Sequence, residues 1–325
     1  MSSIKVSIIT SAMNRSSYLP RVWESLKKQN NKNFEWVIGN DGSIDGTIDL
    51  VKNLFPQSDF PITLVSASKR IGKSMIDNHA IAQAKGEYII LCDSDDWLEK
   101  NAIDEMLNSA AKYDSSYDSN FLGIIGLSKD NLGKCKSAFP EAINPPLSLN
   151  DLFYKYGFQE DCAILFKRAI LRSNPFPEVD FYTPEGSVWS KIGHMKVGIC
   201  NKIILNKEYQ SDHAISFTNL FIYSRGKALS LALIYRNLLK EHTKGFNKPL
   251  DIFTYIRFSL HGDVHFKEMF LLFKIRFWAM MIILLPIAYA YSKKDILQGR
   301  VIKTHIDFQK SSPRYKLAID TSNNK

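Results

Sequence analysis

Apolar and polar residues alternate along the first hundred positions in blocks that predict strands followed by helices. Ile4–Thr10 is a continuous β-branched run, as expected for a strand covered on both faces. Tyr18–Gln29 then carries apolar residues at helical spacing. The same alternation predicts further strands at Phe34–Gly39, Pro61–Ser66 and Glu87–Cys92, and helices after Asp45 and over Gly72–Lys85. We therefore expect an α/β fold with a mostly parallel sheet and helices on both faces.

The pattern loosens from about Ser109. Short strands are expected at Leu122–Leu127, Ala163–Phe166 and Gly198–Leu205, with a helix starting near Glu185. After Asn219 the chain is helical in pattern, and the polar tail after Lys310 is expected to fray. We divide the chain into a domain at 1–217 and a helical region at 218–325.

Two groups of acidic residues follow predicted strands directly. Asp93, Asp95 and Asp96 come after one apolar run, and Asp41 follows another. Ligands bind beyond the carboxyl ends of strands in open sheets of this kind. Crowded carboxylates need a cation to ionise together, and such hard oxygen ligands suit Mg²⁺ or Mn²⁺ bound together with substrate phosphates. The pattern predicts an enzyme that holds a metal–nucleotide at this edge.

Charge is distributed unevenly along the 325 residues. The net charge is +9, yet residues 218–325 hold 18 Lys and Arg against 7 Asp and Glu, a balance of +11, which leaves −2 for the rest. Such asymmetry indicates an anionic partner for the C-terminal region, a membrane surface or nucleic acid. Four scattered cysteines without a C-x-x-C pair, and no apolar secretion signal, fit a cytoplasmic protein.

Phe277–Tyr291 is an uncharged apolar stretch of 15 residues. It is shorter than the roughly 20 residues that span a bilayer. Basic residues and interfacial aromatics border it, so an in-plane or shallowly inserted helix fits best. A buried core or dimer helix is the alternative. Because the aromatics form one apolar block instead of alternating with charges, nucleic-acid binding is disfavoured.

Four motifs in order resemble the family 2 glycosyltransferases of the GT-A fold over roughly residues 3–215. They are the opening strand with Asn14-Arg15, the run Asn40–Thr47 resembling "DDGSxDGT", the stretch from Arg70 to Tyr88, and the DxD-bearing run Leu91–Trp97. The sequence departs from the family at Asn40, where the first Asp is usual, and at Gly186, which replaces half of an "ED" pair.

The resemblance implies a role for each matching residue. Asp41 would accept a hydrogen bond from the ring N–H of a uridine-type base. Asp95 and His213 would bind the metal, with Asp96 in support, and the metal would offset charge on the departing nucleoside diphosphate. Residues expected to bind the nucleotide-sugar are Thr10, Asn14, Arg15, Asp41, Lys73, Asp93 and Ser94.

The resemblance also implies a base that removes the acceptor hydroxyl's proton in a single inverting displacement. Glu185 occupies the equivalent place, with Asp180 in reserve. Structural roles compete for several residues. Asp45 could cap a helix, Asp96 could cap one starting at Trp97, and His213 could be a hydrogen-bonded structural histidine.

The leading hypothesis is therefore a metal-dependent glycosyltransferase using a nucleotide-sugar, with a UDP-sugar favoured. Its acceptor would be a saccharide or polyprenyl-diphosphate-linked saccharide in bacterial surface polysaccharide synthesis. The C-terminal region would hold it on the cytoplasmic face of the inner membrane. An inactive nucleotide-binding or scaffold protein of the same fold is the alternative, motivated by Asn40 and Gly186. No G-x-G-x-x-G follows the first strand, which disfavours a dehydrogenase.

Overall fold

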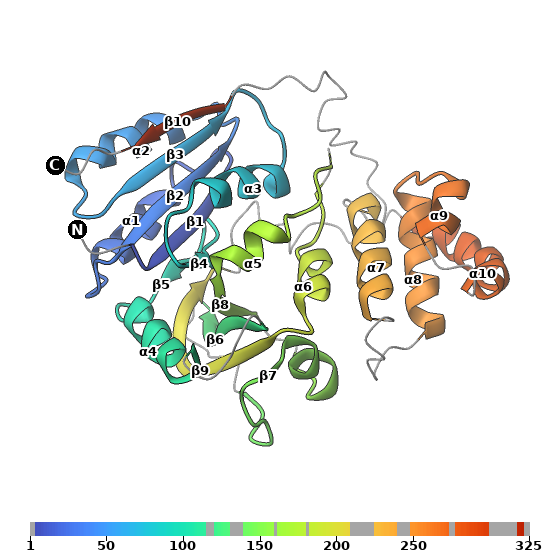
Figure 1. Ribbon diagram of the computed structural model, residues 1–325. Helices are drawn as coiled ribbons and strands as arrows, with labels where there is room; N and C mark the ends of the chain where they lie inside the picture. The colour runs from blue at the N-terminus through green and yellow to red at the C-terminus, as the bar shows by residue number, and fades with distance from the viewer. Residues whose placement is uncertain are drawn as a thin grey trace.

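A single mixed sheet organises the chain (Figure 1). The computed structural model describes residues 4–114, 120–130, 139–158, 161–179, 182–208, 224–238, 248–272, 277–298 and 317–321. Within these ranges the strand order is β10-β3-β2-β1-β4-β8-β6-β9-β5, and β7 pairs with β9. The N-terminal strands are β1 (Val6–Ala12), β2 (Phe34–Asp41), β3 (Ile62–Ala67) and β4 (Tyr88–Leu91).

These four strands run parallel, as predicted. Their residues alternate between two apolar cores, since successive side chains of a strand point to opposite faces. Ile8 packs in the core under α1, α2 and α4, whereas Ile9 packs in the core under α3. Those helices are α1 (Leu19–Lys27), α2 (Thr47–Leu54), α3 (Lys73–Gln83) and α4 (Ala102–Asp114), and a 3-10 turn η1 (Phe55–Gln57) follows α2. Both faces of the sheet are covered, so every strand of this half is buried.

The prediction of a mostly parallel sheet is wrong beyond β4. β8 runs antiparallel to both β4 and β6, β5 and β7 run antiparallel to β9, and only β6 and β9 are parallel. Antiparallel neighbours need no crossover helix, and the described residues between β6 and β8 contain only β7 and a π-helical turn η2. The elements are β5 (Trp97–Leu98), β6 (Phe121–Asp130), β7 (Leu147–Ser148), η2 (Asp151–Lys155), β8 (Cys162–Lys167) and β9 (Lys196–Lys207).

The expectation that Asp96 caps a helix beginning at Trp97 is wrong. Trp97 and Leu98 form β5, and the next helix, α4, begins at Ala102. The carboxylate of Asp96 instead accepts a hydrogen bond from the backbone N–H of Glu208 at 3.1 Å and pairs with Lys207. Long-range partners therefore replace the local capping bond.

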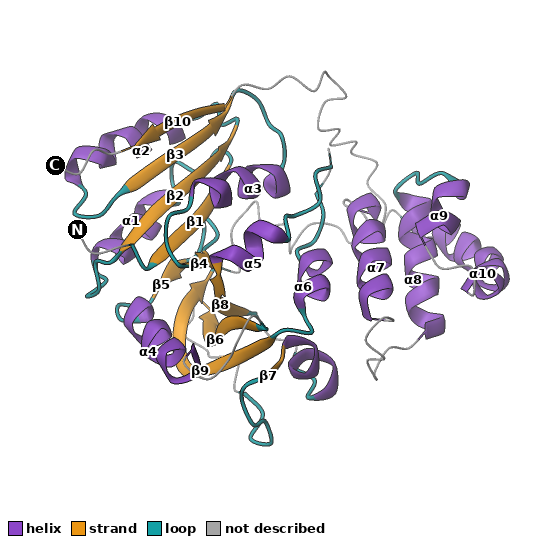
Figure 2. Cartoon of the chain, viewed as in Figure 1, coloured by secondary structure: helices purple, strands orange, loops and turns teal. Residues whose placement is uncertain are grey.

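Helices α5 and α6 lead to an all-helical group at one end of the molecule (Figure 2). Gly226 of α7 approaches the backbone of Tyr182 just before α6, and Asn237 Nδ2 of α7 donates to Ser190 Oγ of α6 at 3.1 Å. The C-terminal helices therefore pack directly behind α6. The helices are α5 (Arg168–Ser173), α6 (Gly186–Ile192), α7 (Ser224–Leu238), α8 (Lys248–His261), α9 (Phe266–Leu272) and α10 (Trp278–Leu297).

The tail does not fray throughout, contrary to the prediction. β10 (Leu317–Thr321) pairs antiparallel with β3 and extends the sheet at its edge, with Lys52 Nζ 3.3 Å from Asp320 Oδ2. The short run Leu-Ala-Ile alternates too briefly to be recognised as a strand by its pattern. Part of the C-terminal region thus returns to the N-terminal sheet.

Candidate active site

Three loops that carry predicted site residues meet at one edge of the sheet. β1 lies between β2 and β4, and all three run in the same direction. Their carboxyl ends therefore lie side by side. Asn14 and Arg15 follow β1, Asp41 ends β2, and the four residues 93–96 follow β4. We name residues Asp93–Asp96 the acidic loop. The predicted juxtaposition of this loop with Asp41 at the same sheet edge is present in the fold.

Asp41 is buried and holds the loop that enters α3. Its Oδ1 accepts hydrogen bonds from the backbone N–H groups of Ile71, at 2.5 Å, and Gly72, at 3.0 Å. Burial raises the pKa of Asp41, while these two bonds and nearby Arg70 lower it. Gly42 has φ +64°, and a Cβ there would lie 2.3 Å from the carbonyl carbon of Lys69. The close approach of these two loops therefore requires glycine at 42.

The loops after β1 and β2 are joined by a ladder of hydrogen bonds. Asn14 N–H donates to Ser43 Oγ and Ile44 N–H donates to Asn14 Oδ1, both at 2.9 Å. Arg15 N–H donates to Thr47 Oγ1 at 2.9 Å. Asn14 has φ 54°, a conformation that Asn tolerates better than most residues. The two loops form one rigid unit around the site.

Thr10 and Asp45 have structural partners beside these loops. Thr10 is fully buried, and its hydroxyl accepts a hydrogen bond from Trp36 Nε1 at 3.0 Å. The carboxylate of Asp45 accepts hydrogen bonds from the N–H of Thr47, which starts α2, and from the N–H of Ser16. Burial raises the pKa of Asp45, but hydrogen bonds from the hydroxyls and N–H groups of Thr47 and Ser16 lower it to about 2. Asp45 thus fixes a helix start, as the capping interpretation proposes, and Thr10 contacts the core.

Lys73 lies at the centre of an acidic cluster. Its Nζ is 2.8 Å from Glu185 Oε1, 2.9 Å from Asp77 Oδ2 and 3.4 Å from Asp93 Oδ1. Burial lowers the pKa of Lys73, but the charges of these three carboxylates raise it by more, so the pKa is well above its usual value. Lys73 is therefore a permanent cation that links α3, the acidic loop and the start of α6.

The carboxylates around Lys73 differ in accessibility. The Asp77 side chain is 4% exposed, whereas that of Asp93 is 43% exposed. Burial raises the pKa of Asp77 to about 6 despite the opposing charge of Lys73. The pKa of Asp93 is lowered, chiefly by Lys73. Asp93 is thus ionised and open to solvent beside a fixed ammonium group.

Lys207, at the end of β9, supports the other side of the acidic loop. Its Nζ lies 3.0 Å from Asp96 Oδ2 and 4.0 Å from Asp93 Oδ2. Burial lowers the pKa of Lys207, but Asp96, Asp93 and Asp161 raise it well above the ordinary value. Burial raises the pKa of Asp96 to about 7 against the effect of Lys207. Asp96 therefore has a structural partner on β9.

The sequence also matches a known family. The model of "Glycosyl transferase family 2" matches residues 7–174, which is more than half of the chain. The chain belongs to glycosyl transferase family 2. The matched segment includes β1 from Ser7 on, β2 to β4, the acidic loop and Lys73.

Curated relatives named as glycosyltransferases support this assignment. The GalNAc(5)-diNAcBac-PP-undecaprenol beta-1,3-glucosyltransferase of Campylobacter jejuni is 26% identical over 57% of this chain and 58% of the relative. The poly(ribitol-phosphate) beta-N-acetylglucosaminyltransferase TarS of Staphylococcus aureus is 27% identical over 56% of this chain and 30% of the relative. The matches thus span less than two thirds of the length of these curated relatives.

Solved structures show that the glycosyl transferase family 2 chain has the GT-A fold. S. aureus TarS 1–349 in complex with UDP-GlcNAc has a TM-score of 0.58 at 17% identity, covering 96% of this chain and 99% of that chain. The mannosyltransferase PcManGT from Pyrobaculum calidifontis, in complex with GDP-Man and Mn²⁺, has a TM-score of 0.51 at 17% identity and covers 90% of this chain and 87% of that chain. At these identities the likeness concerns the fold.

The acidic loop of this family 2 protein has the donor chemistry for a divalent cation. Asp93 and Asp95 offer partly exposed carboxylate oxygens, the hard ligands that Mg²⁺ and Mn²⁺ prefer. Across the described ranges, no three His, Cys, Asp or Glu side chains are grouped to hold a metal ion. Mg²⁺ is commonly bound by one or two carboxylates together with substrate phosphates, so the loop fits that mode of binding.

Glu185, the residue predicted to act as the base, belongs to the Lys73 cluster. It precedes α6 and contacts Lys73, so it belongs to the same cluster as Asp93. Its side chain is about one-third exposed. Ser94 is buried in the acidic loop. The other two predictions, Asp180 as the reserve base and His213 as a metal ligand, fall outside the described residues.

Sequence reasoning missed two charged residues of the cluster. Asp77 follows Lys73 by four positions on α3, a spacing that places both on one helix face and could have been recognised. Lys207 is brought to Asp96 by the pairing of β9 with β5 and β6, for which no local signal exists. The site therefore holds two fixed lysines among its carboxylates.

Proposed function

We propose that this family 2 protein transfers a sugar from a nucleoside-diphosphate sugar, a UDP-sugar, to a saccharide hydroxyl with the help of Mg²⁺ or Mn²⁺. The observation that carries the proposal is the sheet edge that Asp41 and the acidic loop share, with Glu185 linked to the loop through Lys73. The structural neighbours support it, since TarS is solved with UDP-GlcNAc and with UDP, and PcManGT with GDP-Man and Mn²⁺.

The donor would lie across the edge from Asp41 to the acidic loop. The remaining lone pairs of the Asp41 carboxylate would accept the ring N–H of uracil, which favours a base that donates at this position. Arg15, whose charge also lowers the pKa of Asp93, would face the diphosphate. Asn14 would shape the same pocket through its bonds to the loop after β2.

The cation, held by Asp95 with Asp93 beside it, would neutralise charge on the departing nucleoside diphosphate. Glu185 would accept the proton of the acceptor hydroxyl as that oxygen attacks the anomeric carbon, and a single displacement of this kind inverts its configuration. Lys73 holds Glu185 in place and would lie close enough to the leaving diphosphate to share its ammonium charge with it.

A donor panel tests the proposed reaction directly. The purified protein is incubated with Mn²⁺, membrane lipid extract and a series of radiolabelled UDP- and GDP-sugars, and both nucleoside diphosphate release and label in the lipid phase are measured. We expect transfer from a UDP-sugar that stops when EDTA is added. Tight UDP binding with no transfer from any donor would instead favour an inactive nucleotide-binding protein.

The acceptor is proposed to be a polyprenyl-diphosphate-linked saccharide of bacterial surface polysaccharide synthesis. The name of the Campylobacter relative includes PP-undecaprenol. In this chain α6, which follows Glu185, packs against α7 of the C-terminal helical group. An acceptor held near that group by its lipid would therefore reach the side of the site where the proposed base lies.

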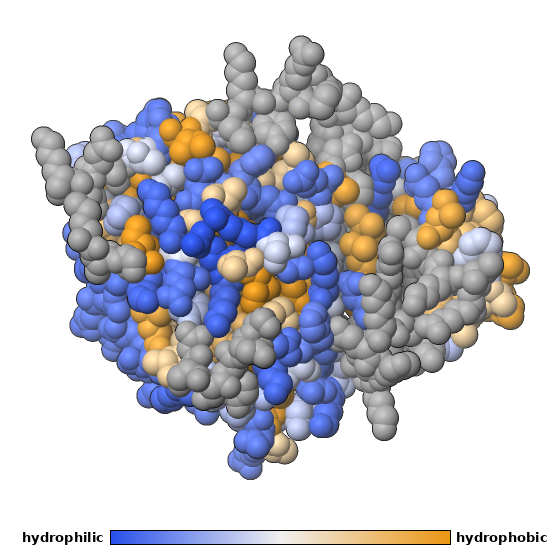
Figure 3. Space-filling view, in the orientation of Figure 1, coloured by the Kyte–Doolittle hydropathy of each residue, from blue (hydrophilic) through white to orange (hydrophobic). Residues whose placement is uncertain are grey.

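The outer face of α10 is the surface proposed to contact the membrane. Ile282, Ile283 and Ile287 are 60%, 70% and 49% exposed, while Met281 and Ala288 are buried toward α8. Exposed Lys293 and Lys294 lie on the next turns, and apolar atoms gather where α9 and α10 lie (Figure 3). Among the described helices, none is both long and apolar enough to cross a bilayer. The exposed isoleucines and the lysines suit a helix lying in the plane of an anionic interface.

We expect the native protein to sediment with vesicles containing phosphatidylglycerol, less so at high salt. Ile283→Glu/Ile287→Glu should weaken this binding by about tenfold or more, because burial of each isoleucine is worth roughly 1.5–3 kcal/mol. Ile319→Glu, at an exposed apolar position on β10, is the matched control and should sediment like the native protein. Equal sedimentation of the double variant and the control would exclude α10 as the contact surface.

A further inference from the structure

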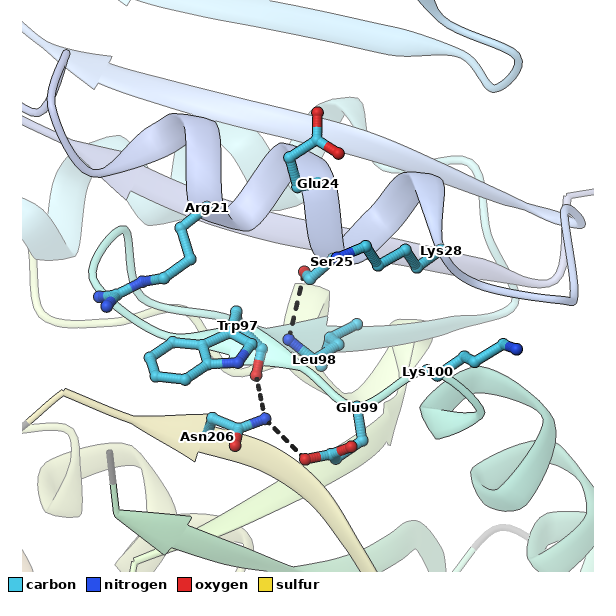
Figure 4. A pocket seen from close by; sticks show the side chains of 9 residues that line it. All are labelled: Arg21, Glu24, Ser25, Lys28, Trp97, Leu98, Glu99, Lys100 and Asn206. Atoms are coloured by element: carbon cyan, nitrogen blue, oxygen red, sulfur yellow. Dashed lines mark hydrogen bonds between the residues drawn. The ribbon is translucent and has the colours of Figure 1, made fainter. Parts of the chain in front are cut away.

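Arg21 of α1 contacts the acidic loop from the side away from Lys73. One of its terminal nitrogens donates to the backbone carbonyl of Asp95 at 2.5 Å, and the other pairs with Glu208 Oε2 at 2.9 Å. Its guanidinium carbon lies 4.1 Å from the centre of the Trp97 ring. Figure 4 shows the Arg21 side chain extended along the indole. The three partners of Arg21 are thus Asp95 in the acidic loop, Trp97 directly after that loop, and Glu208 directly after β9.

The strand after the acidic loop is firmly anchored. Leu98 N–H donates to Ser25 Oγ, and Asn206 Nδ2 donates to the Trp97 carbonyl, each at 3.3 Å (Figure 4). Within the loop, Asp96 N–H donates to the Asp93 carbonyl at 3.0 Å. The loop is therefore a tight turn between two fixed strands. Arg21 binds the carbonyl of Asp95 at its tip.

We propose that Arg21 is a positioning residue that orients the Asp95 carboxylate toward the divalent cation. The inference rests on the proposed function, in which Asp95 binds that cation. The Asp95 carboxylate projects from the same Cα as this carbonyl, so the Arg21 bond restrains the backbone that sets where the side chain can reach. Partners that orient a metal ligand commonly change metal affinity 10–100-fold when removed. The planar guanidinium is suited to this task because it holds the carbonyl and Glu208 at once.

Arg21 does not fill space in the apolar core, so its effect on Asp95 can be tested without disturbing that core. A cavity of about 290 Å³ lies beside Arg21, Trp97 and Asn206. The Arg21 side chain is also partly exposed. Shortening it therefore leaves no new void in the apolar core, and we expect little loss of folding stability.

Mn²⁺ titration followed by electron paramagnetic resonance, with UDP present, tests the inference. Arg21→Gln should bind Mn²⁺ about tenfold more weakly or worse than the native protein. Arg172→Gln is the matched control, because Arg172 also donates to backbone carbonyls, those of Ile81, Ala82 and Ala84 at the end of α3. It should bind Mn²⁺ normally. The thermal midpoints of both variants are measured alongside.

Arg21→Lys provides a second variant if Arg21→Gln does not fold. It keeps the charge but cannot hold the Asp95 carbonyl and Glu208 in one plane, so Mn²⁺ affinity should again fall by severalfold. Unchanged Mn²⁺ affinity in a folded Arg21 variant would overturn this inference alone. A native protein that binds UDP but no Mn²⁺ would overturn both the inference and the proposed metal dependence.

Discussion

Glu185→Gln is expected to lower kcat by about 10²–10⁴-fold while the KM for the nucleotide-sugar changes little. The amide oxygen of glutamine can still accept a hydrogen bond from Lys73, which lies 2.8 Å from the native carboxylate. The substitution therefore removes the proton-accepting carboxylate but keeps a side chain of the same shape at this position. Steady-state kinetics with the donor found by the panel, together with UDP affinity by calorimetry, measure the two effects separately.

Two further variants locate the base. Glu178→Gln changes an exposed glutamate of the loop before α6 and should leave kcat within about twofold of native. Asp180→Asn tests the reserve candidate under the same conditions. A large fall in kcat for Asp180→Asn, with Glu185→Gln close to native, would reassign the base to Asp180.

Asp95→Ala is expected to reduce turnover by about 10²–10³-fold or more, because the loss of charge stabilisation on a leaving group is worth several kcal/mol. The backbone carbonyl that Arg21 holds is retained in this variant, so the loop should keep its fold. Activity as a function of Mn²⁺ concentration distinguishes a lost ligand from a lost fold: the variant should need far more Mn²⁺ to reach its residual rate.

Asp59→Ala is the matched control for this experiment. Asp59 is an exposed aspartate paired with Lys32, at 3.0 Å, away from the acidic loop. Its replacement should leave both the rate and the Mn²⁺ requirement unchanged. An Asp95→Ala variant that matches this control in rate would remove Asp95 from the metal site.

The N-terminal half of the fold follows closely from local pattern. A β-branched run predicted β1, and short apolar segments predicted β2, β3 and β4, each within a few residues of its observed bounds. The helix expected at Gly72–Lys85 is found as α3. These segments are buried on both faces or bounded by glycine, so composition and position agree. The same pattern placed Asp41 and the acidic loop at carboxyl strand ends, and parallel pairing then brings the ends together.

What the sequence did not predict depends on contacts between distant segments. Lys73 and Glu185 are 112 positions apart, and no local signal pairs them. β8 was expected as a strand, but its antiparallel direction is set by its neighbours β4 and β6. The edge strand β10 was not expected, since a short apolar run alone can form a strand or part of a helix. Asp96 could have capped a helix starting next to it in the sequence, but the pairing of β9 with β5 places Lys207 beside its carboxylate instead.

Anomalous diffraction from crystals grown with Mn²⁺ and UDP tests the central claim most directly, because it locates the cation and the nucleotide independently of activity. We expect one Mn²⁺ peak within coordination distance of the Asp95 carboxylate and of the diphosphate, with the uracil ring against Asp41. Mn²⁺ or UDP bound at a place that does not join Asp41 to the acidic loop would contradict the proposed site.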